Sequence, residues 1–377
     1  MRTLAPLIIA FSISLPAPGQ MLQPGDLVAS DALALIREMP PDPAGAAIRV
    51  DPDTGAQERL YDAPRLQIPF GIAIDPQQRL LLTEIGYLGG DTRVLRFDPG
   101  SGESEALCTD GVLSSPTGVE VIPSGDILVA NPSLGLIFGD GGSGVSSIVR
   151  CERDGSSTVV TQGQRLGPDG PGFLAVEPEG TLLVTDPEEL GGSGEVIRVD
   201  PNASPGSNQS ALARGPLVDP TGIAFDPVCG AYVVDTVGIG GTGRIYRLDR
   251  TTGSLTALCQ GAPLVDPVGA AIERERGCSV VVANFDLEAL YQALEAEDPL
   301  AAILAVPRSL VRCDTATNAM QVVTQDGELV LPLDVMVVAE PGSLASGLAA
   351  LCALAAIRRR CPLAPRGQDK KPRKRRA

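Results

Sequence analysis

The sequence contains no histidine and no tryptophan, and its three lysines all lie close to the C-terminus, at Lys370, Lys371 and Lys374. The lack of histidine excludes Ser-His-Asp and Cys-His catalysis and histidine metal ligands. The lack of lysine in the rest of the chain excludes Schiff-base chemistry there. Any catalysis must therefore use Asp, Glu, Tyr, Cys or a metal held by oxygen ligands.

Aromatic residues are also scarce, at 3% of 377 residues, whereas 44% of residues are hydrophobic and there are 43 glycines and 33 prolines. This composition favours a turn-rich fold with a core of Val, Ile, Leu and Ala. The net charge is −16 although residues 358–376 are strongly basic, so the rest of the chain is strongly acidic. An acidic body argues against nucleic acid as a partner.

Short apolar runs separated by turn residues recur along the chain. In residues 220–259, four such runs are separated by Asp-Pro, a glycine loop and Thr-Thr-Gly, which is typical of one antiparallel sheet. Copies of this unit begin at six prolines: Pro69, Pro116, Pro171, Pro220, Pro267 and Pro332. The N-terminal part starts with a second strand, and the last copy has only a first strand. The sequence therefore predicts an all-β, six-bladed β-propeller over residues 21–340, closed by pairing of its N- and C-terminal strands.

The repeat carries three motifs: P-x-G-I-A-hydrophobic-D, then L-hydrophobic-V-x-D/N/E, then hydrophobic-R-hydrophobic-D-P-x-T/S-G, as in residues 94–102 and 48–55. With these motifs, residues 25–340 resemble the NHL-repeat and streptogramin-lyase-like six-bladed propellers. The resemblance implies the fold, but propellers host many unrelated activities.

Two enzyme families with similar propellers depend on residues that this chain lacks. Streptogramin lyases use a histidine base. Gluconolactonase-like propellers hold a metal with a Glu, two Asn and an Asp, one Asn lying in a Pro-Asn-Gly start. The corresponding starts here have other residues: Phe70, Thr117, Thr221 and Val268. Both departures argue against transferring those activities.

Both ends of the chain differ from the repeat. Residues 1–20 have one Arg, an apolar run and then small residues, which predicts a secretory signal peptide with a helical apolar region; the alternative is a buried first strand. At the other end, Glu340-Pro341-Gly342 precedes an apolar run and Arg358, Arg359 and Arg360. This arrangement resembles the PEP-CTERM sorting tail of bacterial exported proteins.

That resemblance implies that residues 341–360 form a hydrophobic helix, which holds the protein at the inner membrane until a sorting protease removes it. The positive charge after the helix fits the positive-inside rule. Residues 361–377 are expected to be a disordered basic tail. The alternative is a soluble Ala/Leu helix followed by the same tail. The expected location is the periplasm, the cell surface or the extracellular space, with membrane tethering through the C-terminal helix.

Cys229 and Cys278 lie in the same turn of two neighbouring blades. Cys108 and Cys259 each end a fourth strand, and Cys151 and Cys313 each end a third strand of the following blade, so all three pairs should come close in space. We therefore predict three disulfides: Cys108–Cys151, Cys229–Cys278 and Cys259–Cys313. Disulfides are consistent with an oxidising compartment. The alternative is buried unpaired thiols; metal ligation is disfavoured because there is no C-x-x-C pair.

One polar residue ends each second strand and forms a predicted ring on the face that carries the loops between second and third strands: Asp31, Glu84, Asn131, Asp186, Asp235 and Asn284. As a functional site, this ring suits a cation such as Ca²⁺ or a polyol. As a structural feature, each side chain would instead cap its own turn. An arginine also repeats on each third strand, where we expect pairing with acids and packing between blades: Arg49, Arg96, Arg150, Arg198, Arg247 and Arg312.

Two longer loops on that face, residues 131–146 and 285–307, break the repeat, and specificity tends to lie at such breaks. Residues 286–294 read as an amphipathic helix, acting either as a plug on the propeller or as a ligand lid.

The sequence favours an exported, non-enzymatic binding or surface module with a protein, polysaccharide or small ligand on the loop face. We expect a monomer that contacts the inner membrane and a sorting protease transiently, and no cofactor apart from Ca²⁺ if the ring binds one. The alternative is a metal-dependent hydrolase or lactonase-like enzyme that uses the acidic residues at the channel mouth. A lyase of unusual type is a third hypothesis.

Overall fold

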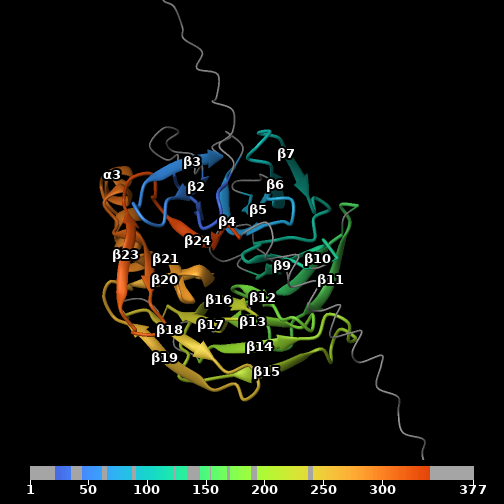
Figure 1. The fold of residues 1–377 in the computed structure, drawn as a ribbon. Helices are drawn as coiled ribbons and strands as arrows, with labels where there is room; N and C mark the ends of the chain where they lie inside the picture. The colour runs from blue at the N-terminus through green and yellow to red at the C-terminus, as the bar shows by residue number, and fades with distance from the viewer. Residues whose placement is uncertain are drawn as a thin grey trace, which may run out of the picture. The chain divides into compact units, whose positions relative to one another are not determined.

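The structure is a computed structural model that describes residues 22–34, 45–61, 66–86, 91–122, 124–133, 145–152, 154–167, 170–187, 193–236 and 241–339. These residues form six four-stranded antiparallel sheets. Figure 1 shows the sheets arranged as blades around a centre, with their first strands innermost. The predicted six-bladed propeller is confirmed. The predicted signal helix in residues 1–20 and the C-terminal helix in residues 341–360 lie outside the described residues.

Each blade contributes one strand to each of four layers, counted outward from the centre. Blades 1 to 6 have as their first strands β24 (Pro332–Val337), β4 (Ile68–Ile74), β8 (Val119–Val121), β12 (Leu174–Val176), β16 (Pro220–Asp226) and β20 (Asp266–Glu273). The second strands are β1 (Leu27–Asp31), β5 (Leu80–Ile85), β9 (Ile127–Asn131), β13 (Leu182–Asp186), β17 (Gly230–Asp235) and β21 (Ser279–Phe285).

The outer two layers follow in the same blade order. The third strands are β2 (Ala46–Val50), β6 (Arg93–Phe97), β10 (Ser147–Cys151), β14 (Glu195–Val199), β18 (Arg244–Leu248) and β22 (Arg308–Cys313). The fourth strands are β3 (Gln57–Tyr61), β7 (Ser104–Leu107), β11 (Ser157–Gln162), β15 (Gln209–Ala213), β19 (Leu255–Gln260) and β23 (Met320–Gln325). A short 3-10 helix, η1 (Arg274–Arg276), joins β20 to β21.

Blade 1 closes the ring, as the sequence predicts. Its first strand, β24, comes from the end of the propeller and pairs antiparallel with β1, so that Ala29 lies opposite Val335. Beyond the paired strands, the N–H of Gly25 donates to the carbonyl of Val338 at 2.8 Å. The closure completes the sheet of blade 1 with strands from both ends of the propeller.

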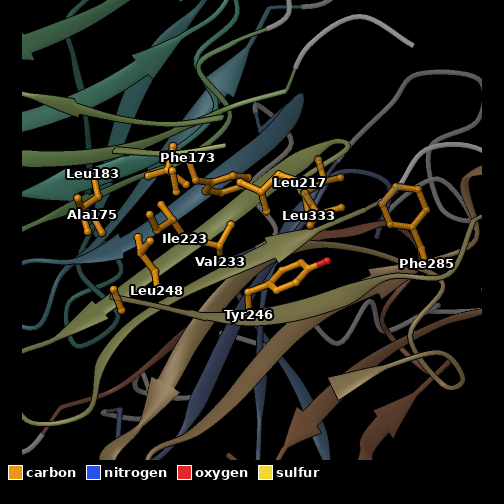
Figure 2. Close-up of a cluster of buried hydrophobic side chains, with 14 of the residues drawn as sticks. Phe173, Ala175, Leu183, Leu217, Ile223, Val233, Tyr246, Leu248, Phe285 and Leu333 are labelled. Atoms are coloured by element: carbon orange, nitrogen blue, oxygen red, sulfur yellow. The ribbon is translucent and has the colours of Figure 1, made fainter. Parts of the chain in front are cut away.

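The hydrophobic core lies between successive blades. Second strands such as β5 and β17 have apolar side chains on both faces, because each blade is covered on both sides, and nearly all of these side chains are buried. Each such side chain stabilises the fold by about 1.5–3 kcal/mol. The largest cluster joins residues of several blades, among them Phe173, Leu217 and Leu333 (Figure 2). Fourth strands such as β7 are largely exposed.

Three disulfides join neighbouring blades, and they are the pairs predicted from the sequence. Cys108–Cys151 links blades 2 and 3, with Cα atoms 5.8 Å apart. Cys229–Cys278 and Cys259–Cys313 both link blades 5 and 6, with Cα atoms 5.4 and 6.1 Å apart. Because disulfides persist in oxidising compartments, they indicate an exported protein.

An insertion between β21 and β22 forms two helices, α2 (Leu287–Leu294) and α3 (Pro299–Leu304). The side chain of Asp286 caps α2 by accepting the N–H of Ala289 at 2.8 Å. The predicted helix over residues 286–294 is thus confirmed. Helix α3 was not predicted, although Asp298 followed by Pro299 is a typical helix start. Neither helix, nor any other in the part of the chain that the structure describes, is long and apolar enough to cross a membrane.

Candidate functional site

The six polar side chains of the predicted ring share one role: each accepts hydrogen bonds from the backbone that leads into the first strand of its own blade. Asp235 shows the pattern, accepting the N–H groups of Asp219 at 2.7 Å and Val218 at 3.1 Å. Asn131 accepts the N–H of Ser114 at 2.8 Å. These bonds satisfy backbone donors that lie outside the sheet.

The two acids at the ends of β1 and β5 are almost completely buried. Asp31 accepts the N–H of Val330 at 2.7 Å, and burial raises its pKa to about 6 even though hydrogen bonds from the backbone oppose the shift. Glu84 accepts the N–H of Gln67 at 2.6 Å and the Nε of Arg93 at 2.6 Å. Burial also raises the pKa of Glu84.

The remaining two members follow the same rule. Asp186 accepts the N–H of Gly167 at 2.9 Å, and Asn284 accepts that of Val265 at 2.8 Å. Among the described residues, no group of three or more Asp, Glu, Cys or His is placed to hold a metal ion. These hydrogen bonds give the side chains a structural role, but they go mainly to the backbone before the first strand of each blade, whereas the expected structural role was a cap on each residue's own turn.

The repeated third-strand arginines divide into two groups. Four of them pair with acids, as predicted: Arg49 with Asp26 at 2.8 Å, Arg96 with Glu105 at 2.6 Å, Arg198 with Glu177 at 2.9 Å and Arg312 with Glu273 at 2.5 Å. Arg247 instead lies over the ring of Tyr232, 5.8 Å from its centroid. For the Nε of Arg150, the described residues offer no hydrogen-bond partner.

The centre of the propeller holds a cavity of about 170 Å³, lined by the first strands of all six blades. Most of the lining residues carry apolar side chains, such as Ile72, Phe173 and Ala271, although polar atoms make up the larger part of the surface that faces the cavity. Two carboxyl groups interrupt this lining, those of Glu120 on β8 and Asp334 on β24. Asp334 is buried, and Glu120 is partly exposed to the channel.

Both channel acids break the repeat, so the sequence did contain a signal for them that our sequence analysis missed. Glu120 occupies the position held in the other blades by small or apolar residues: Ala73, Ala175, Ala224, Ala271 and Met336. Asp334 occupies a position that is glycine in four blades: Gly71, Gly118, Gly222 and Gly269. A Cβ on Gly269 would lie 2.0 Å from Oδ1 of Asp334, so the neighbouring blade has room for this carboxyl only because residue 269 is glycine.

The channel raises the pKa of both acids. Burial raises the pKa of Glu120 to about 7, against one opposing hydrogen bond from the backbone of Val121. Burial also raises the pKa of Asp334 well above its ordinary value, and the charge of Glu120 raises it further. Hydrogen bonds to Asp334 from the N–H groups of Ile72 at 2.9 Å and Val335 at 2.8 Å oppose this shift.

The insertion forms a second candidate site. Leu287 and Leu290 of α2 pack against the large hydrophobic cluster, so this side of the helix acts as a plug. Tyr291 and Leu294 of the same helix are nevertheless 50% and 55% exposed. Residues 134–144 of the other long loop lie outside the described residues.

No protein-family model matches the sequence, and no curated protein matches it. Three solved structures share its fold. A chain in a crystal structure of a nidogen–laminin complex has a TM-score of 0.59 and 16% identity, and the match covers 83% of this chain and 98% of that one. TolB from Acinetobacter baumannii has a TM-score of 0.56 and 12% identity, covering 84% of this chain and 67% of that one.

The third structure is a 6-phosphogluconolactonase candidate from Bacteroides fragilis. Its TM-score is 0.51 at 15% identity, and the match covers 85% of this chain and all of that one (100%). At such identities the likeness shows the fold alone. The propeller fold that the sequence motifs imply is therefore confirmed.

Proposed function

We propose that this chain is an exported, non-enzymatic propeller that binds a protein partner through the exposed side of α2. We call this side the α2 surface and define it as Glu288, Tyr291, Leu294 and Glu295. The observation that carries the proposal is the joint exposure of Tyr291 and Leu294 on the insertion that breaks the repeat.

The spacing of these residues makes the α2 surface continuous. Residues three apart on a helix are neighbours, so Tyr291 lies between Glu288 and Leu294 along one side. A tyrosine with an apolar neighbour and a polar rim is a typical binding anchor. The acids Glu288 and Glu295 favour a partner with basic groups around an apolar pocket.

The helix is held firmly, which lowers the ordering cost of binding. Its first turn is fixed by Asp286 and by Asp266, which accepts the N–H of Leu287 at 2.8 Å. The end of α3 is fixed by the buried Arg308, which donates to the carbonyl of Leu304 at 2.6 Å. The insertion thus presents the α2 surface on a rigid support.

The location of the protein fits this role. The inter-blade disulfides suit an oxidising compartment. As part of the proposal, residues 1–20 act as the signal peptide, and residues 341–360 tether the protein at the inner membrane until a sorting protease acts. A similar fold occurs in the nidogen–laminin complex, and we extend a protein-binding role to this chain on the strength of the α2 surface.

A photo-crosslinking amino acid tests the proposal. It replaces Tyr291 in the full chain expressed in its own host, and a matched variant carries it at Val228, which is 73% exposed in a turn of blade 5. We expect one discrete crosslinked protein from position 291 and none from position 228, and Leu294→Glu should abolish the product. Equal crosslinking from both positions, or none from position 291, would contradict the proposal.

The metal-dependent hydrolase remains the alternative function. It requires the strand-end ring to release its backbone hydrogen bonds in order to bind a cation, which costs the protein the contacts that organise its blades. Catalysis that depends on Ca²⁺ would favour it over the binding role.

A further inference from the structure

We propose that Glu120 and Asp334 share one proton inside the channel around neutral pH, and that loss of this proton weakens the closure of the propeller ring. The pair would make the stability of the ring sensitive to pH. This role is independent of the α2 surface and of any partner.

The first step in the argument is the place of Asp334 in the closure. It lies on β24, the strand that pairs with β1 to close the ring. Its Oδ2 atom accepts the N–H of Ile72 on β4, and its own N–H donates to Oγ of Ser30 at 3.1 Å. The hydroxyl of Ser30 donates in turn to the carbonyl of Phe70. Asp334 therefore joins both ends of the propeller to the second blade.

The second step is the surroundings of Glu120. It lies on β8, which packs beside β4, so that one first strand separates it from β24 around the channel. Both carboxyl groups line the same cavity. The residues that line this cavity include no arginine or lysine. Two negative charges would therefore lie in one cavity without a cation among the lining residues.

The third step is that the acids at the C-terminal ends of the other first strands already have partners of opposite charge. Four first strands end in, or are followed directly by, an acid that is already paired with an arginine: Asp75 with Arg79, Glu177 with Arg198, Asp226 with Arg274 and Glu273 with Arg312. In blades 3 and 1 the same position holds Ile122 and Val338. These two blades are the ones that carry their acids inside the channel.

The neighbouring strands add three further acids and no free cation. Asp31 on β1 accepts backbone N–H groups, Glu84 on β5 pairs with Arg93, and Asp266 on β20 accepts the N–H of Leu287. Strands β9, β12 and β21 contain no titratable residue. None of these groups offers the channel pair a positive charge.

A proton shared by the two carboxyl groups avoids the repulsion between two buried negative charges. A buried carboxylate is poorly solvated, and two carboxylates in one site disfavour ionising together. With one proton bound, a single negative charge remains, and the hydrogen bonds from Ile72 and Val335 stabilise it. When the second group ionises, repulsion acts on β24 and hence on the closing strand pair.

The sign of the pH effect follows from linkage. Both acids hold protons more tightly in the folded chain than in the unfolded chain, so folding is favoured on the acidic side. Stability then falls as pH rises from the ordinary carboxyl range through the folded pKa values of the two acids.

The test compares urea unfolding of the wild-type chain and Glu120→Gln from about pH 5 to about pH 8.5, with the disulfides intact. The two proteins should be similarly stable at the acidic end. At the alkaline end, the unfolding equilibrium constant of the wild type should exceed that of E120Q by roughly 100-fold. The exposed Glu103→Gln is the matched control and should follow the wild type throughout.

A second measurement holds even if E120Q fails to fold. The infrared spectrum of the wild type should show a protonated carboxylic acid near neutral pH that disappears on the alkaline side, and Asp334→Asn should alter this band. Parallel pH profiles of the wild type and E120Q would overturn the proposal. So would a spectrum without any protonated carboxyl at neutral pH.

Discussion

The side chain of Asp334 accepts a hydrogen bond from the backbone N–H of Ile72 at 2.9 Å, although the two residues lie 262 positions apart in the sequence. The bond joins the first strand of blade 1 to the first strand of blade 2. It shows how closure of the ring brings the two ends of the repeat array together and buries an acid where they meet.

The space around Asp334 depends on Gly269, so Gly269→Ala should destabilise the protein. The added Cβ would lie 2.0 Å from Oδ1 and 2.6 Å from Cα of Asp334, and the backbone atom cannot move aside cheaply. We expect a loss of about 1–3 kcal/mol in the free energy of unfolding, measured by urea denaturation. Gly215→Ala is the control, since no atom lies within 4 Å of its Cβ position. Equal effects of the two changes would contradict the steric argument.

The strand-end residue Asp31 should contribute more to the free energy of folding than a surface carboxylate does. Asp31→Ala leaves the buried N–H groups of Val330 and Leu331 without their acceptor, which costs about 1–3 kcal/mol of folding free energy. Asp31→Asn retains one acceptor oxygen and should lose less. Thermal unfolding of the two variants checks the order, and an equal loss would argue against the hydrogen-bonding role.

The raised pKa of Asp31 should also make the stability of the protein depend on pH. Because burial raises the pKa of Asp31 to about 6 in the folded chain, its contribution favours folding at acidic pH and is lost as pH rises through that value. Asp31→Asn should therefore flatten the pH dependence of the melting temperature between about pH 4 and about pH 6. A profile that stays as steep as that of the wild type would show that other groups dominate.

Removing a disulfide should destabilise the ring at the blades that it joins. Replacing Cys259 and Cys313 together by serine should lower the free energy of unfolding by about 2–4 kcal/mol, because the unfolded chain regains conformational freedom. Hydrogen exchange should rise chiefly in blades 5 and 6. Peptide mapping without reductant checks that the disulfide forms in the wild type. Free thiols at both positions would remove the basis for this prediction.

Calcium should leave the melting temperature unchanged if the strand-end ring is purely structural. Each ring side chain already binds backbone N–H groups, so a cation would have to compete with them. Differential scanning fluorimetry with added Ca²⁺ or with a chelator measures this directly. A melting temperature that rises with Ca²⁺ and falls with the chelator would instead support the metal-dependent hydrolase.

Much of the architecture could be predicted from the sequence because the repeat is local. The proline start, the Asp-Pro turn and the arginine strand recur along the repeat, so the strand positions could be predicted, and with them the partners of Cys229 and Cys259 in the next blade. Helix α2 was predictable for the same reason, since its periodicity and its cap are contained in a few consecutive residues.

The roles of the candidate site residues were harder to predict from the sequence. Asp235 at the end of a strand is compatible with a metal ligand or with a cap, and only its contacts with Val218 and Asp219 distinguish the two. Glu120 and Asp334 were visible as breaks in the repeat, but their positions differ within it, so equivalence alone does not pair them.

The sequence by itself determined the number of blades, the closure of the ring and the cysteine pairs, because each depends on a pattern repeated at short range. Only the tertiary structure decided that two acids far apart in sequence, from blades 1 and 3, line one central cavity, and that the strand-end acids are bound by backbone. The physical reason is that burial and hydrogen bonding depend on the groups that surround a side chain, and ring closure supplies those groups from parts of the chain that are far apart in sequence.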